Sequence, residues 1–225
     1  MYQLYIGNKN YSSWSLRPWV LMKHFEIPFE EVNKEVAGRG ANDLHRAYSA
    51  NGLLPCLHAD GFQIWDTLAI AEFLNEQHPD KKLLPNDIHS RARARSISAE
   101  MHSGFAALRS AMPMNIKMRL KGKAATEAVS ADIARIEAIW TEARHGYAGD
   151  KPYLFGDFSI ADAMYAPIVW RLFSYNVQLT SPAQAYLEAM LAHPAMREWE
   201  AAALAETTAL VSYDEAVFEE YGGPR

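Results

Sequence analysis

Three serines lie close together at the start of a predicted helix, in the stretch NYSSWSLRPWVLMKH that spans residues 10–24. From Ser15 onward the apolar residues recur at helical spacing, and Pro18 fits the first turn, where backbone N–H groups have no helical partner. A serine hydroxyl at this place can cap the helix or contact a substrate. Taken alone, Ser12, Ser13 and Ser15 are best explained as turn and cap residues.

Two further polar pairs precede apolar helical patterns. Asp66 or Thr67 is expected to cap the helix that begins there, because a side-chain oxygen can accept from the free N–H groups of the first turn. Ser159 and Asp162 form an S-x-x-D box, in which two reciprocal hydrogen bonds satisfy such N–H groups. We expect Ser159 and Asp162 to be structural, so that a substitution there harms folding rather than chemistry.

The pattern before Thr67 is that of an α/β layer. Two short apolar segments are separated by Asp60-Gly61, a strong hairpin signal. The predicted order is strand, helix, strand, a helical or irregular link, two strands and a helix, which matches a thioredoxin-like module. In chain order the predicted elements are a strand at 2–7, a helix from 15, a strand within 27–36, the link at 41–49, strands within 54–59 and 62–65, and a helix from 66 or 67.

After a polar, proline-marked segment the signal becomes helical almost to the end. We therefore predict a thioredoxin-like domain at 1–79, a linker at 80–86 and an all-helical domain at 87–225. The predicted helices of the second domain are Asp87 to Met112, Thr126 to His145, Ser159 to Ser174, Pro182 to Ala192 and Pro194 to Ala205.

Composition argues against several classes of protein. The formal net charge of -5 gives no general attraction to nucleic acid or to an anionic membrane. No apolar run has the length of a membrane span, and the first residues do not read as a signal peptide, so we expect a cytoplasmic protein. The single cysteine, Cys56, excludes an internal disulfide and a cysteine-rich metal site, and we expect it to be buried and inert. The eight histidines show no metal-binding spacing, so no metal is predicted.

Four short motifs, in order along the whole chain, resemble the cytosolic glutathione transferases, nearest to the serine-type zeta and theta classes. SSWSLR (12–17) is similar to the zeta SSCSxR loop, and LPCL (54–57) to the turn whose proline is cis. WDTLAIAEFL (65–74) is similar to the segment that binds the γ-glutamyl group, and SIAD (159–162) to the capping box of the helical domain. The fold implied by this resemblance is the same two-domain arrangement.

The resemblance assigns the serines a role in activating the thiol of glutathione. By its position relative to Arg17, Ser12 aligns with the catalytic serine, and Ser13 is the second choice, while Ser15 is better explained as the cap of the first helix. An ordinary thiol has a pKa of about 8.5, and lowering it by about 2 units needs about 2.7 kcal/mol of preferential stabilisation of the thiolate. A hydroxyl donor at a helix N-terminus supplies part of this stabilisation.

The same resemblance implies the glutathione-binding residues. The backbone of Leu54, before cis Pro55, would pair with the cysteinyl unit, and Asp66 and Thr67 would hold the γ-glutamyl end. Trp14 is expected to border glutathione, although zeta enzymes have cysteine at its position. Asp66 is shorter than the usual Glu or Gln, Thr67 replaces Ser, and Leu53 replaces a residue that is often polar. These differences leave the class open and predict weaker glutathione binding.

The resemblance also implies that the second substrate binds beside the thiol, against the first helices of the helical domain. Met101 and Phe105 offer an apolar wall, although ordinary burial in a helix explains most of the apolar residues of this segment equally well. His102 and Arg109 are seven residues apart, and so on nearly one helix face, where they could bind an acidic substrate or serve a dimer interface.

The predicted function is that of a glutathione transferase, with glutathione as co-substrate and the electrophile unknown. Two alternatives stay open: a glutathione-dependent cis–trans isomerase of maleyl-type acids, and a non-catalytic binding module on the same fold. A glutathione-linked reductase or peroxidase is less favoured, because the first loop has no cysteine. The resemblance also implies a homodimer.

Overall fold

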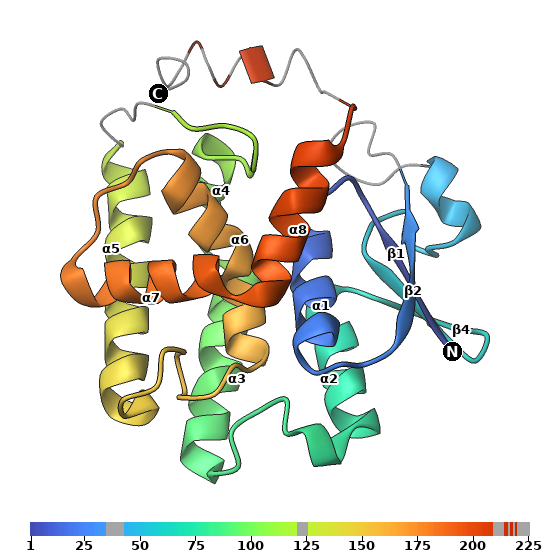
Figure 1. The fold of residues 1–225 in the computed structure, drawn as a ribbon, viewed down its shortest axis with the longest axis horizontal. Helices are drawn as coiled ribbons and strands as arrows, with labels where there is room; N and C mark the ends of the chain where they lie inside the picture. The colour runs from blue at the N-terminus through green and yellow to red at the C-terminus, as the bar shows by residue number, and fades with distance from the viewer. Residues whose placement is uncertain (35–42, 121–125, 209–213, 216, 218, 220–225) are drawn as a thin grey trace.

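The structure is a computed structural model that describes residues 1–34, 43–120, 126–208, 214, 215, 217 and 219. It has two regions, a sheet with its helices and a group of longer helices beside them (Figure 1). An α/β layer followed by a mainly helical region is the predicted fold class, which is therefore confirmed. The predicted helical or irregular link at 41–49 and the predicted strand within 27–36 extend in part outside the described residues.

A four-stranded sheet forms the first region, in the order β2-β1-β3-β4. β1 and β2 are parallel, whereas β3 runs antiparallel to β1 and β4 antiparallel to β3. The β3–β4 turn is made by Asp60 and Gly61, which have φ angles of 49° and 82°, as a tight hairpin requires. The strands are β1 (Tyr2–Ile6), β2 (Phe29–Asn33), β3 (Cys56–Ala59) and β4 (Phe62–Trp65).

Helices α1 (Ser13–His24) and α2 (Thr67–Gln77) cover one face of this sheet (Figure 1). α1 makes the crossover between the parallel strands and also packs against α6 (Ile160–Ser174) and α8 (Pro194–Ala205) of the helical region. Because α1 is covered on both sides, every residue from Ser15 to Met22 is buried. The N-terminus of α1 is thereby held at the junction of the two regions.

The helical region begins with a difference from the prediction. A single helix over Asp87 to Met112 was wrong: the chain forms α3 (Ile88–Ser103) and the short α4 (Ala106–Ala111). Phe105 has a φ angle of 57°, which breaks the helix, and the carboxylate of Asp132 accepts the Leu108 N–H of the new first turn at 2.9 Å. His102 and Arg109 therefore lie on different helices.

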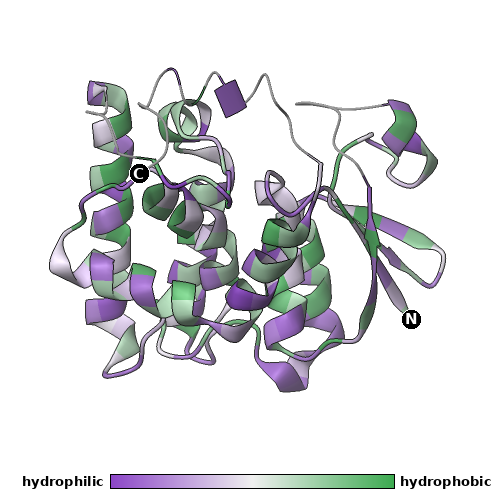
Figure 2. Cartoon of the chain, turned by 45° about the horizontal axis from the view of Figure 1, so that its top comes forward, coloured by the Kyte–Doolittle hydropathy of each residue, from purple (hydrophilic) through white to green (hydrophobic). Residues whose placement is uncertain are grey.

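The remaining helices begin and end close to the predicted residues. They are α5 (Glu127–Ala143), α6, α7 (Ser181–Ala192) and α8, and α5 continues into a π-helical turn at Arg144–Ala148. Apolar and polar residues alternate along α5, the helix at the left edge of Figure 2, as expected for a helix that buries one side. Two short 3-10 helices, Asp43–Ala47 and Pro79–Lys81, lie in the connections before β3 and after α2. The division into domains at residues 79 and 87 stays a prediction.

The start of α6 holds the S-x-x-D box. Asp162 is fully buried, and its carboxylate accepts from the N–H of Ser159 at 2.9 Å and from the Ser159 hydroxyl at 3.0 Å. The same carboxylate accepts from the Leu154 N–H and the Tyr186 hydroxyl, each at 3.0 Å. Burial raises the pKa of Asp162 to about 6, although these four donors oppose the rise. The pair thus ties α6, α7 and the loop before α6 together.

Candidate active site

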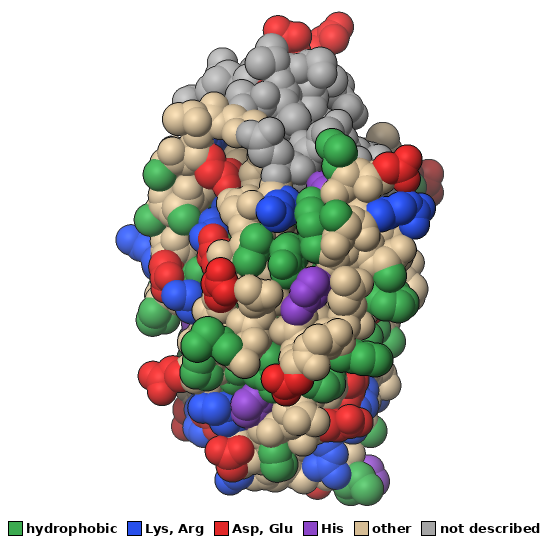
Figure 3. All heavy atoms as spheres, turned by 90° about the vertical axis from the view of Figure 1, so that its right-hand side faces the viewer, with side chains coloured by type: hydrophobic (Ala, Val, Ile, Leu, Met, Phe, Trp, Pro, Cys, Tyr) green, Lys and Arg blue, Asp and Glu red, His purple; other side chains and the backbone are tan. Residues whose placement is uncertain are grey.

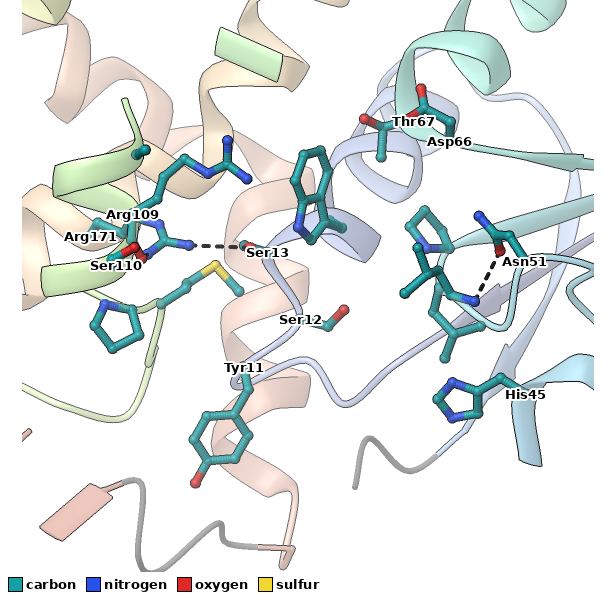
Figure 4. A pocket seen from close by; sticks show the side chains of 17 residues that line it. Tyr11, Ser12, Ser13, His45, Asn51, Asp66, Thr67, Arg109, Ser110 and Arg171 are labelled. Atoms are coloured by element: carbon teal, nitrogen blue, oxygen red, sulfur yellow. Dashed lines mark hydrogen bonds between the residues drawn. The ribbon is translucent and has the colours of Figure 1, made fainter. Parts of the chain in front are cut away.

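A cavity of about 550 Å³ lies where the two regions meet (Figure 4). One wall is formed by the loop before β3 and the start of α2, and the other by α4, the residues after it and Arg171 of α6. The residues just before and at the start of α1 lie between the two walls. The cavity thus has a wall from each region and a helix N-terminus between them.

Ser12 and Ser13 both line the cavity, and their hydroxyls point in opposite directions (Figure 4). Ser12 precedes the first residue of α1 and turns toward the wall of the sheet region, and its hydroxyl donates to the Ser15 hydroxyl at 2.7 Å. Ser13 turns toward the helical region, where its hydroxyl accepts from Arg171 at 3.3 Å. The two serines are therefore not equivalent.

The prediction that Ser15 caps the first helix was wrong. α1 begins at Ser13, so Ser15 stands inside its first turn, fully buried. Its hydroxyl oxygen accepts the backbone N–H of Gly7 at 3.0 Å, which connects the helix to the end of β1. A three-serine motif does not reveal which serine stands at the helix boundary, because the boundary depends on how the chain leaves β1.

The sheet-side wall contains Leu54 and Pro55, and the peptide bond between them is cis, as predicted. The loop before them is held by Asn51, whose side-chain oxygen accepts the Leu53 N–H and the Ser49 hydroxyl, each at 2.9 Å. Cys56 follows on β3, and the prediction that it is buried is confirmed. Burial raises the pKa of the Cys56 thiol, so the thiol stays protonated at neutral pH.

Asp66 and Thr67 complete this wall at the start of α2. Asp66 is the N-cap: one carboxylate oxygen accepts the Leu68 N–H at 2.8 Å and the Ala69 N–H at 3.4 Å. The other oxygen lies 3.1 Å from Nε2 of His102, and the Thr67 hydroxyl lies 3.5 Å from Nδ1 of the same ring. His102, on α3, thus contacts both residues of this pair.

Arginines surround Trp14 on the helical side of the cavity. The guanidinium carbons of Arg17 and Arg109 lie 4.2 and 4.9 Å from the centre of its ring system, and His102 meets the ring edge-on. Arg17 is buried, and burial first, then the charges of Arg109 and Arg171, lower its pKa to about 9. Among the described residues, Nη1 of Arg17 has no hydrogen-bond partner.

Arg109 and Arg171 both line the cavity, so they place positive charge at its wall. Arg109 folds back on its own chain and donates to the carbonyls of His102 and Gly104 at 3.2 and 3.1 Å. Arg171 is buried on α6 and donates to the carbonyls of Arg109 and Met112. Arg109 has no salt bridge to a carboxylate among the described residues.

Comparison with known proteins gives two matches to family models, along most of the chain. Residues 11–77 match the model "Glutathione S-transferase, N-terminal domain", and residues 92–202 match "Glutathione S-transferase, C-terminal domain". The chain belongs to the glutathione S-transferase family. The resemblance drawn from the four motifs is therefore confirmed.

Curated relatives in this family carry the name maleylacetoacetate isomerase. A probable maleylacetoacetate isomerase of Caenorhabditis elegans is 27% identical over 79% of this chain and 81% of that protein. The maleylacetoacetate isomerase of Rattus norvegicus is 26% identical over the same shares.

Solved structures share the glutathione S-transferase fold. A maleyl pyruvate isomerase, described as a bacterial glutathione S-transferase of the zeta class, is 22% identical with a TM-score of 0.70 over 92% of this chain and 100% of that one. A homologue from Burkholderia gl BGR1, solved with bound glutathione, is 23% identical with a TM-score of 0.69 over 91% and 99%.

The predicted second-substrate residues of this family member do not all reach the cavity. Arg109 lines it, whereas Met101 and Phe105 are buried and His102 stands behind Asp66 and Thr67. Arg109 follows the break and lies on α4, whereas Met101 and His102 precede it on α3 and Phe105 stands at the break itself. The cavity-lining residues that do come from this segment are Ala106, Arg109, Ser110, Pro113 and Met114.

Sequence reasoning missed Arg171, Asn51 and Tyr11 as cavity residues. Arg171 had a usable signal, because a charge inside the apolar run AMYAPIVWRLF is costly to bury without a purpose. Tyr11 points away from the two serines, and its hydroxyl donates to Asp214 at 2.8 Å (Figure 4). Asn51 also had a usable signal, because Asn followed by Gly favours a turn, and its side-chain oxygen bonds to Ser49 and Leu53, two positions away on either side.

Two wider properties concern the described residues. No helix among them is long and apolar enough to cross a membrane. No group of three or more histidine, cysteine, aspartate or glutamate side chains in that part of the chain is arranged to hold a metal ion.

Proposed function

We propose that this chain binds glutathione in the cavity, stabilises its thiolate and directs it at a small electrophile that carries a negative charge. Family membership supports glutathione as the co-substrate. The observation that carries the choice of electrophile is the pair Arg109 and Arg171 on the wall opposite Leu54, Pro55 and Asp66.

On the sheet side, the proposed glutathione contacts follow the chemistry of the wall. Asp66 holds the γ-glutamyl amine, and Thr67 at the start of α2 holds the α-carboxylate with nearby N–H groups. The backbone of Leu54, before cis Pro55, pairs with the cysteinyl unit, which brings the sulfur toward Ser12. Trp14 borders the same space. Ser12 then donates to the sulfur at the N-terminus of α1, where the helix dipole also favours an anion.

On the helical side, the two guanidinium groups that line the cavity, those of Arg109 and Arg171, favour an anionic group. Charge-assisted hydrogen bonds from a guanidinium to a carboxylate are strong, and they strengthen as water is excluded. Ser13, whose hydroxyl oxygen accepts from Arg171, keeps its own proton to donate to such a group. The electrophile is therefore proposed to carry a carboxylate beside its reactive carbon.

Two outcomes of thiolate attack fit this arrangement. In conjugation, the sulfur forms a bond to carbon and either a leaving group departs with its electron pair or a proton is taken up. In isomerisation, the sulfur adds to a cis double bond, the π electrons move to the adjacent carbonyl as an enolate, the single bond rotates, and the enolate expels the thiolate. The names of the curated relatives favour isomerisation of maleyl-type acids as the second candidate.

A homodimer in the cytoplasm is also proposed, as is common in the family. Large apolar side chains are exposed around β3 and β4, at Leu53, Phe62 and Trp65. Seen from that side of the molecule, apolar side chains lie among charged ones across the surface (Figure 3). Such side chains are available to a second copy of the chain.

Glutathione binding is expected to depend on the charge of Asp66. Asp66→Asn keeps an oxygen that can cap α2 but removes the carboxylate charge, so we expect the affinity for glutathione to fall about tenfold, as for one lost ion pair. Isothermal titration calorimetry measures it, with Asp80→Asn, on the surface after α2, as the matched control. No binding by the parent protein at millimolar glutathione would contradict the proposed function and favour a non-catalytic module.

Selectivity for a charged electrophile is expected to depend on Arg109. For Arg109→Gln we expect kcat/KM to fall about tenfold with a cis-enone carboxylic acid, because one charge-assisted contact is lost. With the uncharged methyl ester of the same compound, the two proteins should have equal kcat/KM. Steady-state kinetics with both compounds measures the ratio, and an equal loss for acid and ester would show that Arg109 does not recognise charge.

A further inference from the structure

A second serine lies directly behind Ser12. The Ser15 hydroxyl is fully buried, 2.7 Å from the Ser12 hydroxyl and 3.0 Å from the N–H of Gly7. Ser15 is absent from the residues that line the cavity, whereas Ser12 lines it. Gly7 N–H, Ser15 and Ser12 thus form a chain of hydrogen bonds that runs from the end of β1 to the cavity.

The number of hydroxyl protons in this series of hydrogen bonds limits which groups it can bind. Each hydroxyl has one proton to donate and two lone pairs to accept with. In the structure the Ser12 proton is donated to Ser15, and the Gly7 N–H is donated to the other lone pair of Ser15. A thiolate brings no proton, so Ser12 can bind it only by turning its own proton toward the cavity.

We propose that Ser15 is a positioning residue, which donates to Ser12 when Ser12 donates to the glutathione thiolate. This inference rests on the proposed function. The Ser12–Ser15 contact then survives thiolate binding with its direction reversed, while Gly7 continues to donate to Ser15. Two hydrogen bonds in one direction polarise each other, so Ser12 becomes a stronger donor to sulfur than an isolated hydroxyl.

Ser13 is not part of this series of hydrogen bonds. Its hydroxyl accepts from Arg171 and points toward the other wall (Figure 4). The fixed geometry behind Ser12, a buried hydroxyl anchored on a backbone N–H, is what distinguishes the two neighbouring serines. The structure therefore assigns the contact with sulfur to Ser12 and the contact with the electrophile wall to Ser13.

The test is the pKa of the bound glutathione thiol, measured from the ultraviolet absorbance of the thiolate as pH is varied. For Ser12→Ala we expect the pKa to rise by about one unit, and for Ser15→Ala by about half a unit, because a weaker but intact donor remains. The double variant should match Ser12→Ala alone, because Ser15 acts only through Ser12. Ser13→Ala should leave the thiol pKa unchanged.

The matched control is Ser98→Ala. Ser98 is a buried serine on α3 whose hydroxyl donates to a helix carbonyl at 2.7 Å, away from the cavity. Ser98→Ala removes a buried hydroxyl, as Ser15→Ala does. A general effect of destabilisation would therefore shift the thiol pKa in both variants. Ser15→Thr, which keeps the hydroxyl, should retain the pKa of the parent protein.

An unchanged thiol pKa in Ser15→Ala, or a further rise when Ser15→Ala is added to Ser12→Ala, would overturn the inference. Failure of the proposed function has a different signature, since the parent protein would then bind no glutathione. Should Ser15→Ala not fold, Ser15→Cys replaces it, because a thiol accepts from Gly7 but donates only weakly to Ser12. For Ser15→Cys we again expect the pKa of the bound glutathione thiol to rise by about half a unit, with no further rise when Ser12→Ala is also present. The spectrum recorded without glutathione is subtracted first.

Discussion

Replacing Asp162 by alanine is expected to lower the free energy of unfolding by about 4 kcal/mol. The side chain is fully buried and accepts four hydrogen bonds, from two backbone N–H groups and two hydroxyls. Alanine leaves all four donors without this acceptor, and each unsatisfied buried donor costs about 1–3 kcal/mol before the structure relaxes. For a chain of this length the loss corresponds to a fall in Tm of about 10 °C.

Asp157 provides the matched control on the same loop. Its carboxylate is exposed and pairs with Lys151 at 2.7 Å, so Asp157→Ala should change the free energy of unfolding by less than about 1 kcal/mol. Chemical denaturation of both variants measures the difference. Glutathione affinity, measured where Asp162→Ala is still folded, should match that of the parent protein, because Asp162 does not line the cavity. A loss below about 1 kcal/mol for Asp162→Ala would show that the four bonds contribute little.

Asp162 also shows why much of the fold could be predicted. Three features are local signals, in which the residues that interact are within four positions of one another. They are the S-x-x-D box that contains Asp162, the Asp60-Gly61 turn and the Asp66 cap. Such signals locate the ends of helices and strands without knowledge of the tertiary structure. The succession of strands and helices along the chain and the approximate boundaries of α5 to α8 followed from them and from hydrophobic spacing.

The break between α3 and α4 had no comparable local signal. Periodicity continues through Met101, Phe105, Leu108 and Met112, and all four are buried, although Phe105 has left-handed backbone geometry. Asp132, which accepts the Leu108 N–H, is 24 residues away. The helix therefore ends because of a partner that sequence spacing does not identify.

The candidate site was predictable on one wall and not on the other. The sheet-side residues belong to short contiguous motifs, whereas the helical-side wall is assembled from α4 and α6, and Arg171 is 158 positions from the Ser13 that it contacts. Contacts of that kind depend on how helices pack. Resemblance to a family was therefore most informative for glutathione and least informative for the electrophile.

The histidine pair that joins α1 to the start of α8 is expected to make the free energy of unfolding depend on pH, by about 3 kcal/mol. His24 Nδ1 and His193 Nε2 are 2.8 Å apart, and Nδ1 of His193 accepts the Ala195 N–H. His193 therefore carries its proton on Nε2 and donates to His24. Burial first, and His24 second, lower the pKa of His193 from 6.5 to about 4, and burial also lowers the pKa of His24.

The direction of the effect follows from proton uptake. The unfolded chain protonates His193 below about pH 6.5 and the folded chain only below about 4, so this contribution is fully present above pH 6.5 and is lost as pH falls toward 4. The total is about 3 kcal/mol. Asp162 acts in the opposite sense, because its raised pKa of about 6 makes stability fall as pH rises between about 4 and 6. The contributions of His193 and Asp162 should therefore nearly cancel in the parent protein in this range.

His193→Asn separates the two contributions. Asparagine keeps a side-chain acceptor for the first turn of α8 but does not titrate, so the Asp162 dependence remains without the opposing one of His193. We expect the free energy of unfolding of this variant to fall from pH 4 to 6, unlike that of the parent protein. The gap between the two proteins should widen by about 3 kcal/mol from pH 4 to 7 in favour of the parent. Denaturant titrations at half-unit intervals measure this gap, with His89→Asn, at an exposed position on α3, as the control. A gap that does not change with pH would show that His193 is protonated equally in the folded and unfolded chains, and that the pair contributes packing alone.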